Sequence, residues 1–257
     1  MTGWPDQPVI YEINTAVWLN GLARAGGRRV TLADVADADW DAITPPGVDA
    51  VWLMGVWERS PAGLALANAN PELQASFLDA LPDLQRADVI GSPYCVRRYV
   101  ADAAFGGPVG LTVARAALAE RGARLILDYV PNHVAPDHPW VSSRPELFVR
   151  GDEHDIKADP AGWMAAAGQV LARGRDPNFP PWPDVLQLDA FSPALRAATA
   201  DLLADIAGQC DGIGCDMAML MTNQVFARTW GGRTGPRRMR SSGPPCWASC
   251  VPGTRRR

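Results

Sequence analysis

The sequence has almost no lysine, and it lacks several features that would assign it to other protein classes. Lys157 is the single lysine, so the remaining positive charge is carried by arginine. No apolar run approaches the roughly 18 residues that a membrane-spanning helix needs, so no membrane association is expected. The N-terminus has neither a basic start nor an apolar stretch, which predicts a cytoplasmic protein without a secretory signal. The five cysteines show no CxxC spacing, which favours reduced thiols over a disulfide framework.

Charge is unevenly distributed along the 257 residues, whose net charge is -4. Residues 231–257 contain seven arginines and no acidic residue, whereas residues 1–230 are acidic and carry no basic patch for nucleic acid. This basic, low-complexity tail has three interpretations: an arm that binds nucleic acid, a disordered segment, or a shifted reading frame in a GC-rich gene. Its mixture of Arg, Gly, Pro, Ser and Cys favours the shifted frame.

Short apolar runs alternate with longer helical stretches, which predicts an α/β fold of βα units around a parallel sheet. The predicted strands cover residues 8–13, 48–53, 124–130 and 212–219. The predicted helices cover residues 31–43, 108–121 and 193–209. Two long connections, 57–107 and about 136–192, are expected to be loop-rich functional insertions, the second with one helix near residues 161–172.

Polar residues cluster at the ends of the third and fourth predicted strands. Asp128 lies near the end of the third strand, with Asn132 and His133 directly after it, and Asp216 lies in the otherwise apolar fourth strand. Because active sites of parallel βα folds lie at the carboxyl ends of the strands, these are candidate site residues. The alternative for a single aspartate is a buried structural role, in which it is paired or hydrogen-bonded.

Five segments, in order over residues 8 to about 230, resemble the α-amylase family of glycoside hydrolases (family 13). LILDYVPNH resembles the D-x-V-x-N-H signature of that family's third strand, and DGIGCDMA resembles the fourth-strand signature. GSPYCVRRYVADAAFGG is similar to the segment before the third strand. VIYEI and VDAVWLMGVWERSP are similar to the first two strands. The resemblance implies a (β/α)8 TIM-barrel fold, of which residues 1–230 would supply the first four βα units.

The resemblance also implies the roles of three residues in the reaction. Asp216 would be the nucleophile that forms a glycosyl-enzyme intermediate, as in retaining glycosidases. Tyr94 would present its ring to the same sugar, and His133 would hydrogen-bond one of its hydroxyl groups. The imidazole and the Asp216 carboxyl are expected to share a cavity. The alternative for Tyr94 is that it only packs under a loop. The alternative for His133 is that it is a loop histidine whose hydrogen bonds are all made within the protein.

Three further residues would support the site. Asp102 and Asp128 would hold loop backbone, and Asn132 matches a position that ligates calcium in many members of the family. Leu220 stands where the calcium-binding members have a histidine, so no metal or other cofactor is expected. An alternative metal cluster would consist of Asp128, His133, Asp137 and His138. Loop tryptophans that could line a sugar cleft or merely pin loops are Trp57, Trp140 and Trp182.

The sequence departs from the family in two respects. Gly214 replaces the arginine that the family places two residues before its nucleophile, which predicts a higher pKa for Asp216. Residues after Met221 contain no Glu or Asp, so the proton donor of a retaining mechanism has no candidate there. Four strands in about 220 residues leave room for only half a barrel, which predicts an aggregation-prone chain unless a partner completes it.

The predicted function is therefore that of an α-amylase-type retaining hydrolase or transglycosidase, truncated and weakly active or inactive. Its substrate would be an α-glucan or maltooligosaccharide; the sugar linkage and the oligomeric state stay open. The alternative is a non-catalytic carbohydrate-binding or interaction protein that keeps Tyr94 and His133 but needs no acid. A nucleic-acid binder that uses residues 231–257 is a third, less favoured hypothesis.

Overall fold

A parallel sheet of four strands, in the order β1-β2-β5-β11, forms the centre of the computed structural model, which describes residues 3–220. The strands are β1 (Ile10–Asn14), β2 (Ala50–Met54), β5 (Arg124–Tyr129) and β11 (Gly212–Cys215). All three pairings are parallel, and the order in the sheet follows the order in the chain. All four strands that the sequence predicts are present, but the fourth ends at Cys215 and not at residue 219, so Asp216 follows the strand. The tail at 231–257 lies outside the described residues.

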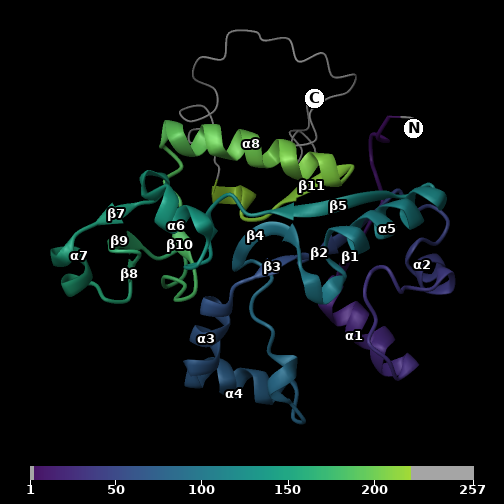
Figure 1. The fold of residues 1–257 in the computed structure, drawn as a ribbon, viewed down its shortest axis with the longest axis horizontal. Coiled ribbons are helices and arrows are strands. Elements are labelled where there is room, and N and C mark those ends of the chain that lie inside the picture. The colour runs from purple at the N-terminus through teal and green to yellow at the C-terminus, as the bar shows by residue number, and fades with distance from the viewer. Residues whose placement is uncertain (1–2, 221–257) are drawn as a thin grey trace, which may run out of the picture.

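Helices connect consecutive strands of this sheet, which gives the alternation expected of βα units (Figure 1). The helices are α1 (Thr15–Gly26), α2 (Asp37–Ile43), α3 (Pro61–Ala69), α4 (Pro71–Ala80), α5 (Gly107–Glu120), α6 (Pro139–Ser143), α7 (Glu153–Ala158) and α8 (Pro193–Gln209). The short 3-10 helices are η1 (Arg86–Asp88), η2 (Ala103–Phe105), η3 (Pro145–Leu147) and η4 (Ala218–Leu220). Among the described residues, no helix combines the length and apolar character required to cross a bilayer.

The predictions for α5 and α8 are confirmed, because both helices carry strong local start signals. Pro108 occupies the first turn of α5, where the missing N–H of proline costs no hydrogen bond. Ser192 caps α8 by accepting a hydrogen bond from the Leu195 N–H, and Pro193 follows it directly.

The prediction of a helix over residues 31–43 is wrong in its first half. Asp34 Oδ2 accepts hydrogen bonds from both the N–H and the hydroxyl of Thr31, which closes a turn instead of starting a helix. The helix α2 begins at Asp37 and ends at Ile43. The helix α1, which follows β1 directly and is capped by the Asn14 side chain, was not predicted.

Both connections that were expected to be loop-rich contain regular structure. The first holds α3 and α4 together with the antiparallel pair β3 (Trp57–Arg59) and β4 (Val96–Ala101). The second is a lobe at one end of the molecule, opposite α1 and α2 (Figure 1). Its strands are β6 (His133–Val134), β7 (Arg150–Gly151), β8 (Trp163–Ala166), β9 (Gln169–Ala172) and β10 (Leu186–Gln187). The helix expected near residues 161–172 is wrong, because this segment forms the β8–β9 hairpin.

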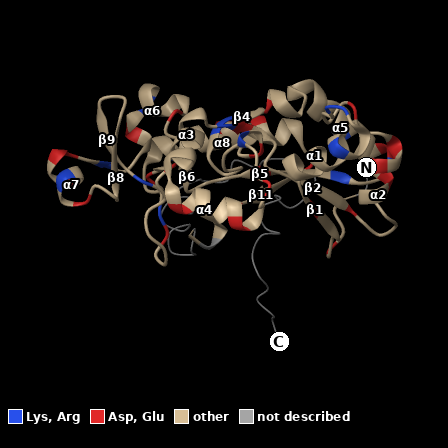
Figure 2. Cartoon of the chain, turned by 90° about the horizontal axis from the view of Figure 1, so that it is seen from below, with Lys and Arg blue, Asp and Glu red and all other residues tan. Residues whose placement is uncertain are grey.

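The lobe has a small apolar core of its own. Its buried residues include Leu147 and Phe148 before β7, Leu171 in β9 and Leu195 in α8. The helix α8 therefore packs against the lobe near its start, and against the main core through Ile206 near its end. Acidic side chains mark the two far ends of the molecule, on α7 and on α2 (Figure 2).

The two faces of the main sheet differ in character. Side chains alternate between faces along each strand, and paired residues of neighbouring strands share a face. One face, with Val51, Leu53, Leu125 and Leu127, is fully buried against the helices. On the opposite face, Glu12 pairs with Trp52, and Trp52 pairs with Ile126 of β5. Asp128 lies two residues further along the same face of β5 and pairs with Gly214 of β11. The polar candidates thus lie on the face that the helices leave free.

Candidate functional site

The two candidate carboxylates lie at the carboxyl end of the sheet. Asp128 is the penultimate residue of β5, and Asp216 follows β11 directly. The backbone N–H of Asp216 donates to the carbonyl oxygen of Tyr129 at 2.8 Å, which extends the pairing of the two strands by one residue. This hydrogen bond fixes the Asp216 backbone beside the end of β5.

Asp128 is buried, and its carboxyl group is held by two neutral donors. Its Oδ2 accepts the Gly55 N–H at 2.5 Å, and its Oδ1 accepts the indole N–H of Trp52 at 2.8 Å. Burial raises the pKa of the Asp128 carboxyl to about 6, while these two hydrogen bonds lower it. The carboxyl therefore ties the turn after β2 to β5, which is the geometry expected of a loop-holding aspartate.

Asp216, Tyr94 and Asp128 act on one another electrostatically. Burial raises the pKa of the Tyr94 hydroxyl to about 12, and the charges of Asp128 and Asp216 raise it further. Burial also raises the pKa of the Asp216 carboxyl, while a hydrogen bond from the Met217 backbone lowers it. Burial is the cause of this rise, so the effect expected from Gly214 stays a prediction. Tyr94 thus remains a protonated phenol, able to donate a hydrogen bond beside two carboxyl groups.

His133 is buried at the start of the lobe, in β6. Its ring makes an edge contact with Trp182, with the ring centroids 5.2 Å apart. Burial lowers the pKa of the imidazole to about 4, although a hydrogen bond with the Tyr94 backbone raises it. The imidazole is consequently neutral at physiological pH, and it is tied to Tyr94 through the backbone of that residue.

Asp102 lies at the start of η2, where its backbone N–H donates to the carbonyl oxygen of Val56 in the turn after β2. It accepts the Ala104 N–H at 2.8 Å and the Arg59 N–H at 3.3 Å, so its carboxylate holds local backbone. Asp102 and Asp128 both raise the pKa of the Arg59 guanidinium, but burial outweighs them and lowers it.

The structure gives the residues of the alternative metal cluster separate partners. Asp137 Oδ1 accepts the Ser60 hydroxyl at 2.6 Å, and His138 Nδ1 accepts the Trp140 N–H at the start of α6. Among residues 3–220, no group of three or more His, Cys, Asp and Glu side chains is arranged to hold a metal ion. Trp57 is buried and donates its indole N–H to the backbone oxygen of Asp128, so it pins a loop to the sheet.

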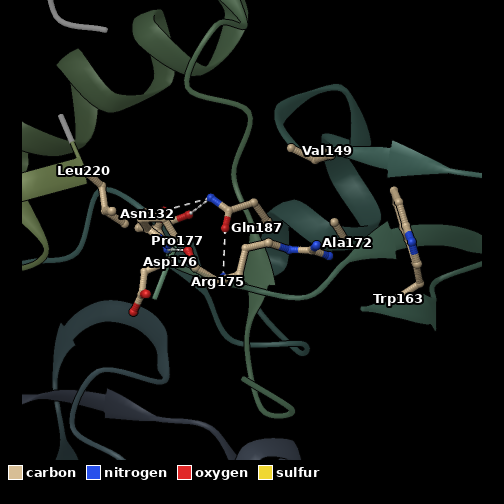
Figure 3. A pocket seen from close by; sticks show the side chains of 9 residues that line it. All are labelled: Asn132, Val149, Trp163, Ala172, Arg175, Asp176, Pro177, Gln187 and Leu220. Atoms are coloured by element: carbon tan, nitrogen blue, oxygen red, sulfur yellow. Dashed lines mark hydrogen bonds between the residues drawn. The ribbon is translucent and has the colours of Figure 1, made fainter. Parts of the chain in front are cut away.

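A cavity of about 490 Å³ lies between the lobe and the end of β11 (Figure 3). Its lining residues are Asn132, Val149, Trp163, Ala172, Arg175, Asp176, Pro177, Gln187 and Leu220. Asn132 lines this cavity, whereas Asp216 and His133 do not, so the cavity does not bring that carboxyl and imidazole together.

The surroundings of Asn132 do not fit the calcium site that the resemblance implies. Calcium takes six to eight oxygen ligands. Asn132 Oδ1 already accepts the amide of Gln187 at 2.9 Å, and its Nδ2 donates to the Arg175 backbone oxygen at 3.3 Å (Figure 3). Asp176 Oδ1 accepts the N–H groups of Asn178 and Phe179. Hydrogen bonds between protein groups therefore join the lobe to the segment after β5 at this point.

Sequence reasoning missed two residues of this region. Gln187 also accepts the Arg175 N–H through Oε1 at 3.0 Å, so its amide connects both sides of the cavity. Trp52 lies in the apolar run VDAVWL, whose pattern predicts a strand and gives no sign of a hydrogen-bonding role for this residue. The alternation along β2 could have identified it, because Trp52 faces away from its buried neighbours Val51 and Leu53.

No family model and no curated protein matches the chain, whereas solved structures do. An α-amylase from Lactobacillus plantarum is similar over 86% of this chain and 41% of its own, with 21% identity and a TM-score of 0.57. A trehalose-6-phosphate hydrolase from Bacillus licheniformis covers 83% of this chain and 36% of its own, with 16% identity and a TM-score of 0.56. An α-glucosyl transfer enzyme is similar over 84% of this chain and 37% of its own, with 19% identity and a TM-score of 0.56.

These similarities confirm the predicted fold. The chain shares the fold of the α-amylase-type (β/α)8 barrel, and it spans less than half the length of each of these proteins. Its four parallel strands are accordingly a partial barrel with a lobe inserted after β5.

Proposed function

We propose that the chain carries the nucleophile side of an α-amylase-type site that acts on α-glucosidic bonds by a retaining mechanism. The observation that supports this most strongly is the position of Asp128 and Asp216 at the carboxyl ends of neighbouring strands, close enough to Tyr94 for both charges to raise its pKa. Similar solved structures include both a hydrolase and a glucosyl transfer enzyme, so the proposal covers both reaction types.

In the proposed reaction, the Asp216 carboxylate attacks the anomeric carbon of a glucosyl unit. A carbon–oxygen ester bond forms as the glycosidic bond breaks, and the leaving oxygen keeps the bonding electron pair and needs a proton. Water or a second sugar hydroxyl then attacks the same carbon, which releases the carboxylate. Because burial raises the pKa of Asp216, the attack slows as the pH falls and this carboxyl becomes protonated.

The neighbouring residues would orient the sugar. Tyr94 would cover the apolar face of the pyranose with its ring, and its protonated hydroxyl suits a sugar oxygen. His133, neutral and tied to the Tyr94 backbone, would hold a substrate hydroxyl. Asp128 would keep the turn after β2 in place through Gly55.

The proton donor is the missing part of this site. Residues after Met221 contain no Glu or Asp, so the donor is not among them. We therefore propose little or no hydrolysis of unactivated maltooligosaccharides by this chain alone. A fluoride leaving group needs no proton donor, so an activated glycosyl fluoride tests the nucleophile separately from the acid.

The test is covalent trapping with a ring-fluorinated α-glucosyl fluoride, followed by mass spectrometry of the intact chain and its peptides. We expect one fluoroglucosyl group on the peptide that contains Asp216, and no adduct in Asp216→Asn. Asp205→Asn is the matched control, because Asp205 is an exposed aspartate on α8 with no part in the proposed site, and its adduct should remain. An adduct that persists in Asp216→Asn would contradict the proposal.

A carbohydrate-binding protein without catalysis is the second candidate, and the lack of acidic residues after Met221 favours it. Binding of maltooligosaccharide in calorimetry, weakened by Tyr94→Ala but with no adduct on Asp216, would support this alternative over the enzyme.

A further inference from the structure

Trp52 and Gly214 fit against each other across the strand that carries Asp128. Gly214 pairs with Asp128, and Trp52 pairs with Ile126, two residues earlier on the same face of β5. A Cβ atom built on Gly214 would lie 2.7 Å from Cζ2 and 2.8 Å from Cε2 of the Trp52 indole. Real Cβ atoms essentially never approach ring carbons that closely, so any side chain at 214 requires the indole to move.

The same indole holds the Asp128 carboxyl. Its Nε1–H donates to Oδ1 at 2.8 Å, while the Gly55 N–H occupies Oδ2. In the position from which it donates to this oxygen, the indole occupies the space above Gly214. Displacement of the ring would therefore leave a buried carboxyl oxygen without its donor, which is unfavourable.

A second glycine of β11, Gly212, also lies close to a tryptophan ring. A Cβ on Gly212 would lie 3.1 Å from Cζ2 of Trp4, whose ring also stacks under the Arg124 guanidinium at 4.8 Å. Gly212 and Gly214 lie on the same face of β11, two residues apart. This face of the strand is thus covered by tryptophan rings where β11 itself has no side chains.

We propose that Trp52 is a positioning residue for the Asp128 carboxyl. Glycine is required at 214 because the indole occupies the space that a side chain at 214 would fill. The resemblance leads one to expect an arginine at 214. Here the Trp52 indole occupies that space and donates its N–H to Asp128. A Gly214→Arg change would accordingly displace Trp52 rather than add a charge to an intact site. The relevance to catalysis rests on the proposed function, whereas the geometry does not.

The test is nuclear magnetic resonance of the full chain with isotope-labelled tryptophan, which resolves each indole N–H. Trp57 is the internal control, because its N–H donates to the backbone oxygen of Asp128 and not to the carboxyl. As the pH rises through about 6, Asp128 ionises and becomes a stronger acceptor. We expect the Trp52 resonance to move downfield over this range and the Trp57 resonance to move much less.

Two substitutions identify the cause of that shift. Asp216, Glu12 and Arg59 also act electrostatically on Asp128, so Asp128→Asn is needed to assign the titration to this carboxyl. We expect Asp128→Asn to abolish the pH dependence of the Trp52 resonance. Gly214→Ala should shift this resonance toward the position of a free indole, with most of its pH dependence lost.

Gly208→Ala in α8 is the matched control, because a Cβ there meets nothing within 4 Å. It should leave the Trp52 resonance in place. The proposal is wrong if Asp128→Asn leaves the titration of Trp52 intact, or if a folded Gly214→Ala chain keeps the wild-type resonance. If Gly214→Ala does not fold, the Asp128→Asn comparison decides alone. No substrate is involved, so the outcome is independent of the trapping experiment.

Discussion

Asp128, His133 and His138 are buried ionisable side chains whose pKa values move in opposite senses. Burial raises the pKa of Asp128 from 3.8 to about 6, and it lowers those of both histidines from 6.5 to about 4. The folded state binds a proton on Asp128 more tightly than the unfolded chain does, so ionisation of Asp128 lowers stability as the pH rises from about 4 to 6. The histidines act in reverse, because their contribution is complete above pH 6.5 and is lost as the pH falls toward 4.

These signs predict the behaviour of Asp128→Asn. We expect the wild-type chain to lose stability between pH 6.5 and about 4, because two histidines outweigh one aspartate. In Asp128→Asn the opposing contribution, on the order of 3 kcal/mol, is removed, so the loss on acidification becomes larger. Urea unfolding at the two pH values measures the difference. A smaller loss in Asp128→Asn than in the wild type would contradict this assignment.

At the scale of elements, the β8–β9 hairpin shows how tertiary contacts override a local preference. The segment from Trp163 to Ala172 is rich in alanine, which by itself favours a helix. Ala167 and Gly168, however, both have positive φ, at 46° and 76°, and they form the two-residue turn of a hairpin. Leu171 is buried in the core of the lobe, and this burial stabilises the extended conformation of β9.

Ala167 is strained in this turn, so its replacement should stabilise the lobe. Asparagine tolerates positive φ better than alanine, and Asn-Gly is a preferred hairpin sequence. We expect Ala167→Asn to raise stability by about 0.5–1 kcal/mol, measured by thermal and urea unfolding. Ala165→Asn is the control, because residue 165 is an exposed strand position with no positive φ. Asparagine is disfavoured in strands, so this variant should be neutral or slightly destabilised.

At the scale of the whole molecule, the sheet has two edges within the described residues. Strand β1 pairs with β2 on one side, and Ile10 and Tyr11 are 46% and 43% exposed along it. Val9, directly before the strand, is 54% exposed. An exposed apolar edge of this kind is a template for pairing with another chain.

We therefore expect concentration-dependent self-association through β1. Tyr11→Lys should reduce it, because a lysine on an edge strand opposes pairing. Light scattering over a range of concentrations measures the effect. Val109→Lys is the matched control, since Val109 is 72% exposed on α5, outside β1. Equal suppression by both variants would indicate a general effect of charge and would contradict a role for the edge.

The sequence alone determined the four strands, α5 and α8, because the signals for them are local. Apolar runs mark β2 and β5, and Ser192 with Pro193 marks the start of α8 whatever surrounds it. The motif around Asp128 and His133, together with Asp216, also predicted which strand ends carry the candidate site. Confirmation of the fold leaves the chemical roles of these residues as predictions.

The tertiary structure decided the features that depend on residues far apart in the chain. A tryptophan at 52 is apolar in any sequence pattern, and only its register with β5 and β11 places its N–H on Asp128 and its ring over Gly214. The hairpin at 163–172 and the hydrogen bond between Gln187 and Asn132 also depend on segments that are distant in the chain. The physical reason is that hydrogen-bond partners and burial are supplied by distant segments, whose positions are set only when the chain has folded.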